Sequence, residues 1–561
     1  MHAAGLTRQI PAVSRRMDSY ASGIEDPIVQ HKARRDSMKY EKLFGRLQNG
    51  NDVRGIAVDS PEEKVTLTDD LAAFISAAFA RYLSKSLGKK ESDLRIGIGH
   101  DSRVSAELIQ AGCLKGLSGT NVYVCGLAST PSMFQSTVYE ESGFDASIMI
   151  TASHLPYNRN GLKFFTKEGG LEKDALTSIL HDAAALAEEY GQEDEQKILS
   201  FGRPELPGGS VEDFDLVSVY CRHMQDYICS QVQAEDYSHP LAGLHIVVDA
   251  GNGAAGFFAH GILEALGADV SGSVFLDPDG TFPNHIPNPE NETAMDAIRK
   301  ATLDAGADLG VIFDCDGDRG AVVFSDGSEV NRNRLIAVLA RIISKSHPGS
   351  TIVTDSVTSD ELAVFLEEKL GMKHLRFKRG YKNVINKGIA LNEEGEDCEL
   401  AIETSGHGAF KDNYFSDDGA YISIKIICEM ARLRREGRKI EELLEGLGEP
   451  AEAVEMRLKI LPPDPADADQ RDFREYGAQV IRDFGEFAAS EEKFHVVQPN
   501  YEGVRVSFDD PEVKGWILVR QSLHDPEIPV NIEAKEEGGT RVIRERVMPF
   551  FKHYNRLQEK S

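Results

Sequence analysis

The sequence is short of positive charge and of long hydrophobic runs, and both shortages exclude partners. Its 561 residues contain 62 Lys and Arg against 91 Asp and Glu, which leaves a net charge of −29. Such a chain lacks the positive surface that non-specific binding to nucleic acid or to an anionic membrane requires. No apolar run approaches the roughly 20 residues of a membrane-spanning helix. We therefore expect neither nucleic acid nor a membrane as a partner.

Cysteine is also scarce, and its pattern does not favour a secreted disulfide framework. The 7 cysteines are scattered and form no CxxC pair. This pattern is typical of reduced thiols in the cytosol or a similar compartment. Residues 1–17 carry Arg8, Arg15 and Arg16 without an acidic residue, as an organelle transit peptide or a plain disordered tail would. We expect a cytoplasmic protein, or one of a plastid or another organelle if residues 1–42 are a transit peptide.

A loosely repeated unit predicts the fold class. Three short apolar strands each end in an aspartate, Asp101, Asp249 and Asp355, and a polar or small turn and a helix-period stretch follow each one. Strand–helix–strand repeats predict parallel or mixed sheets flanked by helices, here in three similar α/β domains. Ligands of such sheets lie at the carboxyl ends of the strands.

Past residue 450 the pattern changes to alternating strands and a final helix, which predicts a C-terminal α+β domain acting as a lid or clamp. The predicted segments are an N-terminal extension (1–42), α/β domain I (43–205), α/β domain II (206–320), α/β domain III (321–449) and α+β domain IV (450–561).

The sequence LGVIFDCDGDRG carries the strongest chemical signal. Asp314, Asp316 and Asp318 alternate in a turn after a buried strand, so their carboxylates can converge on one cation. Oxygen ligands favour Mg²⁺. An EF-hand is excluded, because Arg319 stands where its loop needs glycine. A nucleophilic aspartate of the haloacid dehalogenase type is disfavoured by Asp318, since that motif has Thr or Val there. A solvated acidic turn is the remaining alternative.

Three further loops contain candidate site residues. Ser153 follows an apolar strand in TASHLP (151–156) and lies in no GxSxG elbow, so a hydrolase triad is disfavoured. The loop ETSGH (403–407) offers groups for sugar hydroxyls. Arg520, Ser522 and His524 form a donor cluster suited to phosphate, although an arginine paired with a nearby acid is equally compatible with the sequence. Finally, GNGAAG (251–256) matches a dinucleotide-binding fingerprint, but the same glycines also serve a tight strand–helix turn.

Taken in order, these loops resemble the α-D-phosphohexomutase superfamily of phosphoglucomutases and phosphomannomutases, over roughly residues 44–550. The matching motifs are NDVRG (51–55), GHDSR (99–103), TASHLP (151–156), DCDGDR (314–319), ETSGH (403–407) and RQS (520–522). The resemblance implies a monomer of four domains around a central cleft. It implies interconversion of hexose 1-phosphate and hexose 6-phosphate, of glucose or mannose, with hexose 1,6-bisphosphate as intermediate and activator.

The resemblance also implies a role for each candidate residue. Ser153 would carry the phosphoryl group, and Mg²⁺ would be bound by Ser153 and the three aspartates. Candidates for proton transfer or for stabilising charge near Ser153 are Arg54, His154, Lys163 and His407. Candidates for binding the substrate are Arg319, Lys378, Glu403, Ser405, Arg505, Arg520 and Ser522.

The chain departs from its relatives at a few positions. Leu523 and His524 follow Ser522 where relatives often have Asn-Thr, Val357 replaces a lysine of some bacterial members, and Tyr381 replaces a histidine. These departures, together with the GNGAAG match, leave three alternatives open at this point. The chain could be a variant that releases hexose 1,6-bisphosphate, a catalytically silent sugar-phosphate binder, or an NAD-dependent oxidoreductase.

Overall fold

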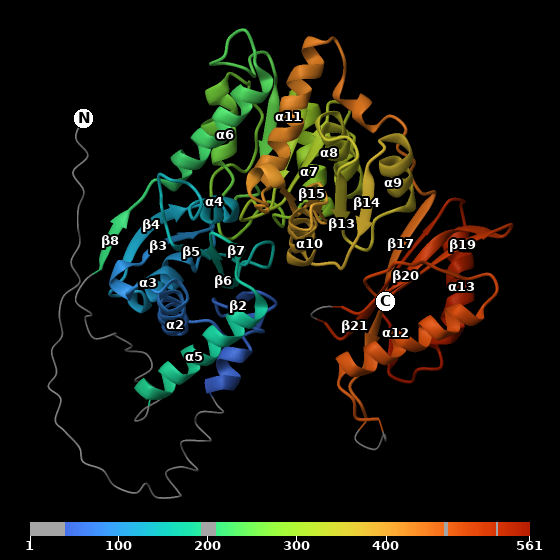
Figure 1. The fold of residues 1–561 in the computed structure, drawn as a ribbon, viewed down its shortest axis with the longest axis horizontal. Helices are drawn as coiled ribbons and strands as arrows, with labels where there is room; N and C mark the ends of the chain where they lie inside the picture. Colours follow the sequence, from blue (N-terminus) through green and yellow to red (C-terminus); the bar gives the residue numbers. More distant parts are fainter. Residues whose placement is uncertain (1–39, 192–208, 465–468, 523–524, 561) are drawn as a thin grey trace, which may run out of the picture. The chain divides into compact units, whose positions relative to one another are not determined.

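The computed structural model describes residues 40–191, 209–464, 469–522 and 525–560 (Figure 1). The possible transit peptide and most of the linker predicted at 204–210 lie outside the described residues. The chain divides into two compact units. The first combines the chain up to Val330 with Ser416–Gly437, and the second combines Asn331–Phe415 with the chain from Arg438 onward.

The first unit contains a sheet of eight strands with a parallel centre. β3 pairs in parallel with β4 and β5, and β8 pairs in parallel with β4. β6 and β2 continue the sheet beyond β5 in antiparallel fashion. The strands are β1 (Gln48–Asn49), β2 (Asp52–Ile56), β3 (Arg95–His100), β4 (Asn121–Leu127), β5 (Ala146–Ile150), β6 (Arg159–Thr166), β7 (Gly169–Gly170) and β8 (Ser210–Asp213).

Helix α2 (Asp69–Leu87) is the centre of the first hydrophobic core. Thr68 caps its first turn, and Gly88 ends it in the left-handed conformation with a φ of 64°. α2 packs against α3 and α5 (Figure 1). The approach to α3 is so close that a Cβ at Gly112 would lie 2.0 Å from a backbone oxygen of α2. The other helices are η1 (Glu91–Asp93), α3 (Ala106–Gly116), α4 (Thr130–Gln135) and α5 (Lys173–Gly191).

The first unit also contains a sheet of four strands in the order β12-β11-β10-β9. β9 and β10 are parallel, whereas β11 and β12 are antiparallel additions. The strands are β9 (Ile246–Asp249), β10 (Leu309–Phe313), β11 (Gly320–Phe324) and β12 (Glu329–Val330). The helices are α6 (Leu216–Val232), η3 (Phe258–Leu263), η4 (Glu264–Leu266), α7 (Glu292–Ala305) and α11 (Gly419–Arg435), which packs on β11 and α6.

The second unit contains the third α/β sheet, in the order β14-β13-β15-β16. β13 pairs in parallel with β14 and β15, and β16 is antiparallel to β15. The strands are β13 (Thr351–Thr354), β14 (Lys373–Arg376), β15 (Cys398–Ile402) and β16 (Gly408–Phe410). The helices are α8 (Arg332–Ser346), α9 (Asp360–Val364), η5 (Phe365–Lys369), α10 (Tyr381–Glu393), η6 (Lys411–Asn413) and η7 (Ile440–Leu444).

The C-terminal part of the second unit is a six-stranded antiparallel sheet in the order β18-β19-β20-β21-β17-β22, packed against two helices. The strands are β17 (Glu452–Ile460), β18 (His495–Val496), β19 (Val504–Asp510), β20 (Val513–Val519), β21 (Glu527–Ala534) and β22 (Leu557–Glu559). The helices are α12 (Phe473–Ser490) and α13 (Gly539–Phe551). Three α/β domains and a C-terminal α+β domain confirm the predicted fold class.

The sheets correct three of the predicted domain boundaries. Tyr40 is 7% exposed and belongs to the first core, so the packed chain begins before residue 43. β8 pairs with β4 in the first sheet, beyond the predicted end at 205. β11 and β12 pair within the second sheet, so the predicted end at 320 cuts through a hairpin, and that sheet extends to Val330. The sequence places α11 in the third domain, whereas the structure packs it in the first unit.

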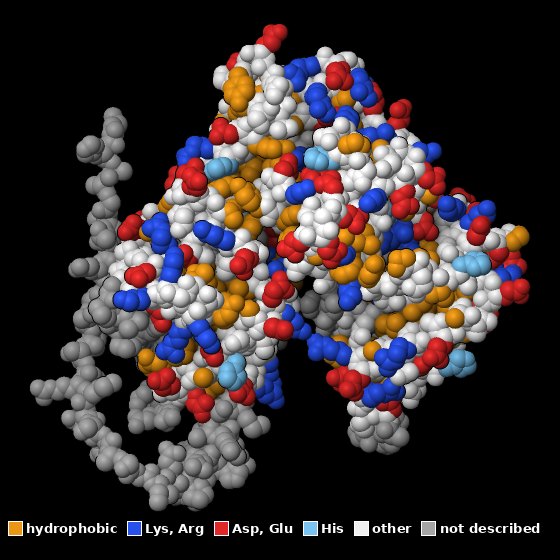
Figure 2. All heavy atoms as spheres, viewed as in Figure 1, with side chains coloured by type: hydrophobic (Ala, Val, Ile, Leu, Met, Phe, Trp, Pro, Cys, Tyr) orange, Lys and Arg blue, Asp and Glu red, His pale blue; other side chains and the backbone are white. Residues whose placement is uncertain are grey.

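None of the described helices is long and apolar enough to cross a membrane. Figure 2 shows acidic and basic side chains interspersed over the visible face, where the described lysines and arginines gather in no single large patch.

Candidate active site

Ser153 lies in the loop that follows β5, and the loop holds it in an unusual backbone conformation. Its φ is 51°, in the left-handed region that non-glycine residues rarely adopt. Thr151 stabilises this turn, because its Oγ1 accepts a hydrogen bond from the Ser153 N–H at 2.8 Å. Ser153 is 7% exposed, so its hydroxyl sits in a largely water-excluded place.

A buried arginine holds the Ser153 loop in place. Arg103 is 2% exposed, and its Nε lies 3.2 Å from Asp101 Oδ2. Its terminal nitrogens donate to four loop carbonyls, those of Ser153 (2.5 Å), Leu155 (2.6 Å), Pro156 (2.6 Å) and Arg159 (2.9 Å). The planar guanidinium, with its five donors, suits this task. Arg103 belongs to the motif GHDSR, but the sequence alone predicted no role for it.

The three predicted metal ligands converge in the loop after β10. Asp314, Asp316 and Asp318 are all 0% exposed. One carboxylate oxygen of each lies within 4.8 Å of those of the other two. Gly317, with a φ of 72°, provides the left-handed turn between the second and third ligands. Thr130 fixes the middle ligand, because its Oγ1 donates to Asp316 Oδ2 at 2.5 Å and its N–H donates to the Asp316 carbonyl at 2.8 Å.

These residues fit a magnesium ion. Three buried carboxylates so close together repel one another unless cations compensate them. Asp316 Oδ1 is buried and has no hydrogen-bond partner among the described residues, so an oxygen ligand is left over for a cation. Ser153 Oγ lies 3.0 Å from Asp314 Oδ2, close enough to serve the same ion. An all-oxygen set of this kind suits Mg²⁺.

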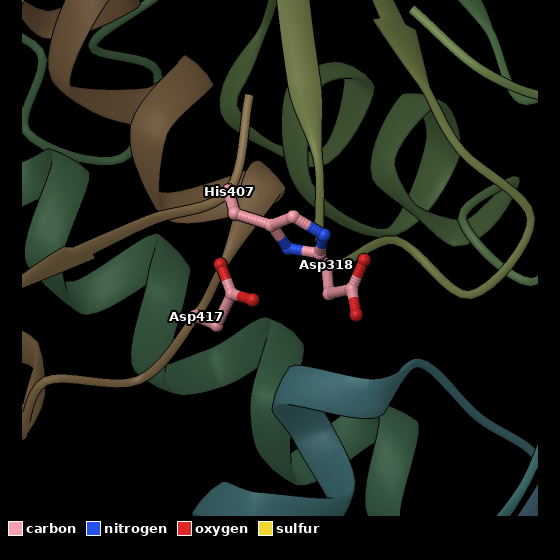
Figure 3. A group of neighbouring side chains, drawn as sticks. All are labelled: Asp318, His407 and Asp417. Carbon is pink, nitrogen blue, oxygen red and sulfur yellow. The ribbon is translucent and has the colours of Figure 1, made fainter. Parts of the chain in front are cut away.

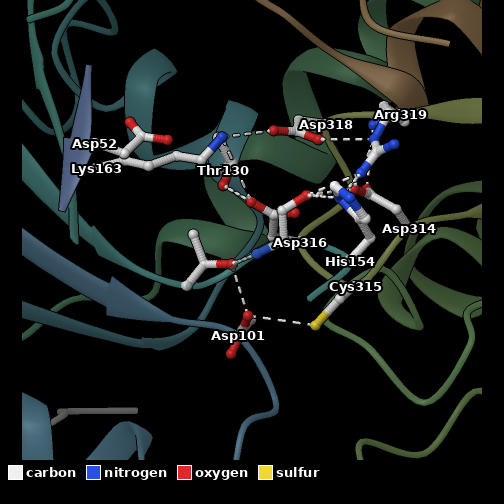
Figure 4. A network of polar contacts seen from close by, with 12 residues as sticks. Asp52, Asp101, Thr130, His154, Lys163, Asp314, Cys315, Asp316, Asp318 and Arg319 are labelled. Atoms are coloured by element: carbon white, nitrogen blue, oxygen red, sulfur yellow. Dashed lines mark hydrogen bonds and ion pairs between the residues drawn. The ribbon is translucent and has the colours of Figure 1, made fainter. Parts of the chain in front are cut away.

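Two buried cations adjoin the three carboxylates (Figure 4). Arg319 Nε lies 3.1 Å from Asp314 Oδ2, and Lys163 Nζ lies 2.8 Å from Asp318 Oδ2. Burial disfavours the charge on Arg319, but the neighbouring carboxylates outweigh it and raise its pKa. With three negative and two positive side chains, the cluster keeps one net negative charge, to which a phosphate on Ser153 would add.

Arg319 and His154 also reach the Ser153 hydroxyl. Arg319 Nη2 donates to Ser153 Oγ at 3.1 Å, and His154 Nδ1 lies 3.3 Å from the same oxygen. Arg319 and His154 contact each other as well. Arg54 contacts the Ser153 loop rather than the hydroxyl itself. It donates to the Thr151 carbonyl and pairs with Asp52 Oδ2 at 2.8 Å. The first unit therefore brings four predicted site residues, Arg54, His154, Lys163 and Arg319, to Ser153, to its loop or to the three predicted metal ligands.

The glycines of GNGAAG serve packing, which corrects the dinucleotide interpretation. A Cβ at Gly253 would lie 2.4 Å from the Cys315 carbonyl oxygen, and one at Gly256 would lie 2.2 Å from the Leu276 carbonyl oxygen. The Ala254 N–H, which a pyrophosphate would use, donates to the Cys315 carbonyl at 2.8 Å. The turn thus supports the metal loop from behind.

Sequence reasoning missed a further carboxylate, that of Asp417. Carboxylate oxygens of Asp417 and Asp318 lie within 4.8 Å of each other (Figure 3). The next residue, Asp418, caps α11 by accepting from the Tyr421 N–H at 2.9 Å, and Tyr220 Oη donates to it at 2.8 Å. No motif signals this approach, because α11 is about 100 residues beyond the metal loop in sequence and reaches it only through the fold.

In the second unit, the ETSGH loop follows β15 and is tightly structured. Glu403 Oε1 accepts from the Gly380 N–H at 2.6 Å, and Ser405 Oγ donates to Glu403 Oε2 at 3.3 Å. The Glu403 N–H donates to the His407 carbonyl at 2.8 Å. The His407 ring stacks on Tyr381, with ring centroids 5.2 Å apart. Glu403, Ser405 and His407 therefore form one preorganised loop.

Arg520 lies just after β20 and is 5% exposed. Its Nε is buried without a hydrogen-bond partner among the described residues, as expected of a group that awaits an anion. Burial lowers its pKa, while nearby Glu502 and Asp355 act in the opposite direction. Glu502 in turn accepts from the Arg379 N–H at 3.1 Å, next to the Gly380 N–H that binds Glu403. Arg520 therefore lies beside the supports of the ETSGH loop.

Two further residues that were predicted to bind the substrate, Ser522 and Lys378, lie in loops of the second unit. Ser522 Oγ accepts from the Asp525 N–H at 3.1 Å and stands in the turn between β20 and β21. Leu523 and His524, where the chain departs from its relatives, lie outside the described residues. Lys378 is exposed and lies in the loop between β14 and α10.

Arg505 was predicted to bind substrate, and the structure corrects that role. It is 2% exposed, and its guanidinium stacks 3.6 Å from the ring centroid of Trp516. It donates to the Ser356 carbonyl at 3.0 Å, the Thr358 carbonyl at 3.2 Å and Asp360 Oδ1 at 2.9 Å. Burial lowers its pKa to about 9. Arg505 joins the C-terminal sheet to the third α/β domain and has no surface left for a ligand.

Comparisons with known proteins agree with this geometry. Three family descriptions match, phosphoglucomutase/phosphomannomutase alpha/beta/alpha domains I, II and III, at residues 45–190, 218–327 and 331–450. A phosphomannomutase/phosphoglucomutase from Pseudomonas syringae is 30% identical, over 87% of this chain and 91% of its own. A phosphoglucomutase/phosphomannomutase family protein from Burkholderia thailandensis matches in structure with a TM-score of 0.70 and 26% identity, over 91% of this chain and 97% of its own.

The fold and these site loops define a sugar-phosphate mutase architecture. The chain belongs to the phosphoglucomutase/phosphomannomutase family of the α-D-phosphohexomutase superfamily, and it is an isomerase that acts by phosphoryl transfer. An Aspergillus fumigatus N-acetylphosphoglucosamine mutase, solved in complex with GlcNAc-6P and magnesium, shares the fold with a TM-score of 0.51 and 12% identity, over 93% of this chain and 99% of its own.

Proposed function

We propose that the protein interconverts hexose 1-phosphate and hexose 6-phosphate, of glucose or mannose, through a phosphoserine at Ser153 and a hexose 1,6-bisphosphate intermediate. The observation that carries this proposal is the convergence on Ser153 Oγ of Asp314 Oδ2, at 3.0 Å, and Arg319 Nη2, at 3.1 Å. A strained, buried serine beside a carboxylate trio is suited to hold a phosphoryl group rather than to be a solvent-exposed turn residue.

In the first half-reaction, the bond from phosphorus to Ser153 Oγ breaks as a bond to a sugar hydroxyl oxygen forms. The hydroxyl proton leaves to a base, and Ser153 Oγ takes up a proton. Arg319 and Lys163 would stabilise the charge on the phosphoryl oxygens, because they contact the carboxylates of Asp314 and Asp318, respectively. Mg²⁺ bound by Asp314, Asp316 and Asp318 would supply further neutralisation of that charge. His154 and Arg54 are the candidates for proton transfer or for charge stabilisation near Ser153, and the family resemblance adds His407 of the second unit as a further candidate.

The second half-reaction needs the bisphosphate to turn, so that its other phosphate returns to Ser153. A carboxylate and a hydroxyl, those of Glu403 and Ser405, bind sugar hydroxyls without favouring one end of the ring. Arg520 and Ser522 would hold whichever phosphate is not reacting, and the buried, unpaired Nε of Arg520 supports this assignment. Free hexose 1,6-bisphosphate would act as the activator by phosphorylating Ser153 in an unmodified enzyme.

The test is the covalent state of Ser153. Intact-protein mass should show about 80 Da of added phosphate that glucose 1-phosphate or mannose 1-phosphate removes, and Ser153→Ala should lack both the phosphate and the activity. Thermal unfolding should be unchanged in this variant, because the lost hydroxyl is small. Turnover in Ser153→Ala, or a labile phosphate elsewhere, would overturn the proposal. If Ser153 carries the phosphate, coupled assays with glucose 1-phosphate and mannose 1-phosphate establish the preferred hexose.

A further inference from the structure

Two strand ends of the molecule carry the same hydrogen bond between an aspartate and a threonine. Asp101 follows β3, and its Oδ2 accepts from Thr151 Oγ1 at 2.7 Å. Asp355 follows β13, and its Oδ2 accepts from Thr404 Oγ1 at 2.8 Å. In both cases the threonine follows the parallel neighbouring strand, β5 or β15. One pair supports the Ser153 loop, and the other supports the ETSGH loop.

The two aspartates differ in how their charge is compensated. Asp101 has the guanidinium of Arg103 at hydrogen-bond distance, 3.2 Å from its Oδ2. Asp355 is 0% exposed, and Arg379 Nε lies 3.7 Å from its Oδ2, beyond hydrogen-bond distance. Its Oδ1 is buried with no hydrogen-bond partner of normal geometry among the described residues. The register that pairs Thr354 with Ile402 places a second carboxylate, Glu403, beside it.

The surroundings of Asp355 raise the pKa of its carboxyl group. Burial first, and then the charge of Glu403, raise the pKa of Asp355 to about 7, although Arg379 and Thr404 act in the opposite direction. The charged groups that face it come from three further elements. They are Glu403 after β15, Arg379 before α10, and Arg520 after β20. The carboxyl is therefore largely neutral below about pH 7 and negative above it.

We propose that Asp355 is a positioning residue that holds the Glu403–Ser405 loop through Thr404, and that its negative charge weakens binding of the anionic sugar phosphate at Arg520 beside that loop. This inference rests on the proposed function, because it concerns the substrate of that same site. A sugar phosphate brings up to two negative charges toward Arg520, and a charged Asp355 competes for the same arginine. Substrate binding should therefore be accompanied by protonation of Asp355.

The decisive variant is Asp355→Asn, which keeps an acceptor for Thr404 Oγ1 but removes the charge. We expect the ratio of the wild-type KM for glucose 1-phosphate to that of the variant to rise about three- to tenfold between pH 6 and pH 8.5, with a midpoint near 7. A tenfold effect corresponds to a shift of one pKa unit on binding. Ionisation of the free substrate in solution affects both proteins equally, so it cancels in the ratio. If the ratio of the two KM values does not change with pH, the charge of Asp355 does not weaken substrate binding, and this part of the proposal is overturned.

Positioning through Thr404 is tested separately. Thr404→Val removes the hydroxyl at similar volume, and it should raise KM at every pH with a smaller effect on kcat. Thr404→Ser should restore the wild-type KM, because it restores the donor. An unchanged KM in Thr404→Val would overturn the positioning role.

A binding measurement keeps the inference testable without turnover. In a Ser153→Ala background, calorimetric titration with glucose 1-phosphate at pH 7 in two buffers of different ionisation enthalpy should show net proton uptake, and Asp355→Asn should abolish it. Asp70→Asn is the matched control, because Asp70 in α2 is also buried with a raised pKa but lies outside both loops. The inference would be overturned if Asp70→Asn abolished proton uptake as Asp355→Asn does, or if the Ser153→Ala protein showed no proton uptake at all. Absence of phosphate on Ser153 would instead refute the proposed function.

Discussion

Lys163 Nζ on β6 lies 2.8 Å from Asp318 Oδ2, so a cation of the first sheet compensates a predicted metal ligand in the loop after β10 of the second sheet. The same nitrogen lies 3.9 Å from Asp316 Oδ2. Lys163 is 4% exposed, and both carboxylates are fully buried. Among the described residues, Lys163 and Arg319 both form buried ion pairs with this trio, and without a metal ion they compensate its negative charge.

Replacing Lys163 by methionine should therefore destabilise the protein much more without magnesium than with it. Breaking one partner out of a buried ion pair costs about 3–5 kcal/mol. Bound Mg²⁺ should offset part of that loss, because it compensates the same carboxylates, and it should bind more tightly to the variant. Urea unfolding with EDTA and with Mg²⁺ measures both effects, and Lys167→Met on the exposed end of the same hairpin is the control. Equal losses under both conditions would contradict this reasoning.

Asp316→Asn should raise the Mg²⁺ concentration needed for half-maximal activity by at least about tenfold, since one ionised ligand is lost from a hard cation site. The amide still accepts from Thr130, so the loop should keep its shape. Activity measured across a magnesium titration checks this, with Asp326→Asn in the exposed turn after β11 as the control. An unaltered magnesium requirement would show that the ion is bound elsewhere.

Arg520→Ala should raise KM for the sugar phosphate by about tenfold or more, the size expected for loss of a charge-assisted hydrogen bond, while kcat changes less. The phosphate that Arg520 contacts would be the spectator in both half-reactions, so the loss is shared by ground and transition states. Initial rates at varied glucose 1-phosphate separate the two constants. A fall in kcat at constant KM would place Arg520 at the reacting phosphate instead.

Arg505→Leu should behave differently from Arg520→Ala, because Arg505 is a structural residue. Its removal leaves the buried carbonyls of Ser356 and Thr358 without their donor, at about 1–3 kcal/mol for each unsatisfied group. Unfolding free energy should fall, and the fluorescence of Trp516, the only tryptophan of the chain, should change even without substrate. A variant with normal stability and only a raised KM would restore the substrate-binding role that the sequence predicted.

The fold and the site loops were predictable because their signals are local. An apolar run followed by Asp101, Asp249 or Asp355 specifies a buried strand and its carboxyl end, and the sheets bring such ends together. The convergence of Asp314, Asp316 and Asp318 was predictable from their alternating spacing alone. The roles of Arg505 and Asp417 were not predictable, because they depend on contacts between distant segments. The local sequence VRVSF does not reveal whether its arginine, Arg505, contacts a ligand or stacks on a tryptophan.

The role of Arg103 in holding the Ser153 loop also depends on contacts between segments that are distant in sequence. Lysine at this position would keep the charge beside Asp101 but could not reach four carbonyls at once, because an ammonium lacks the guanidinium fork. Arg103→Lys should therefore loosen the loop that sets the φ of Ser153. We expect kcat to fall by about 100-fold, with KM changed much less, since small misplacement of a reacting group has effects of this size.

The phosphate content of Ser153 separates loop positioning from general unfolding in this variant. A folded Arg103→Lys protein should take up phosphate from glucose 1,6-bisphosphate more slowly than wild type, in proportion to its loss of kcat. Arg95→Lys is the control, because Arg95 also donates to backbone carbonyls, at Gly143 and Ser142, but away from the Ser153 loop. If Arg103→Lys phosphorylates at the wild-type rate, the loop is held by its own turn and by Thr151, and the arginine only fills space.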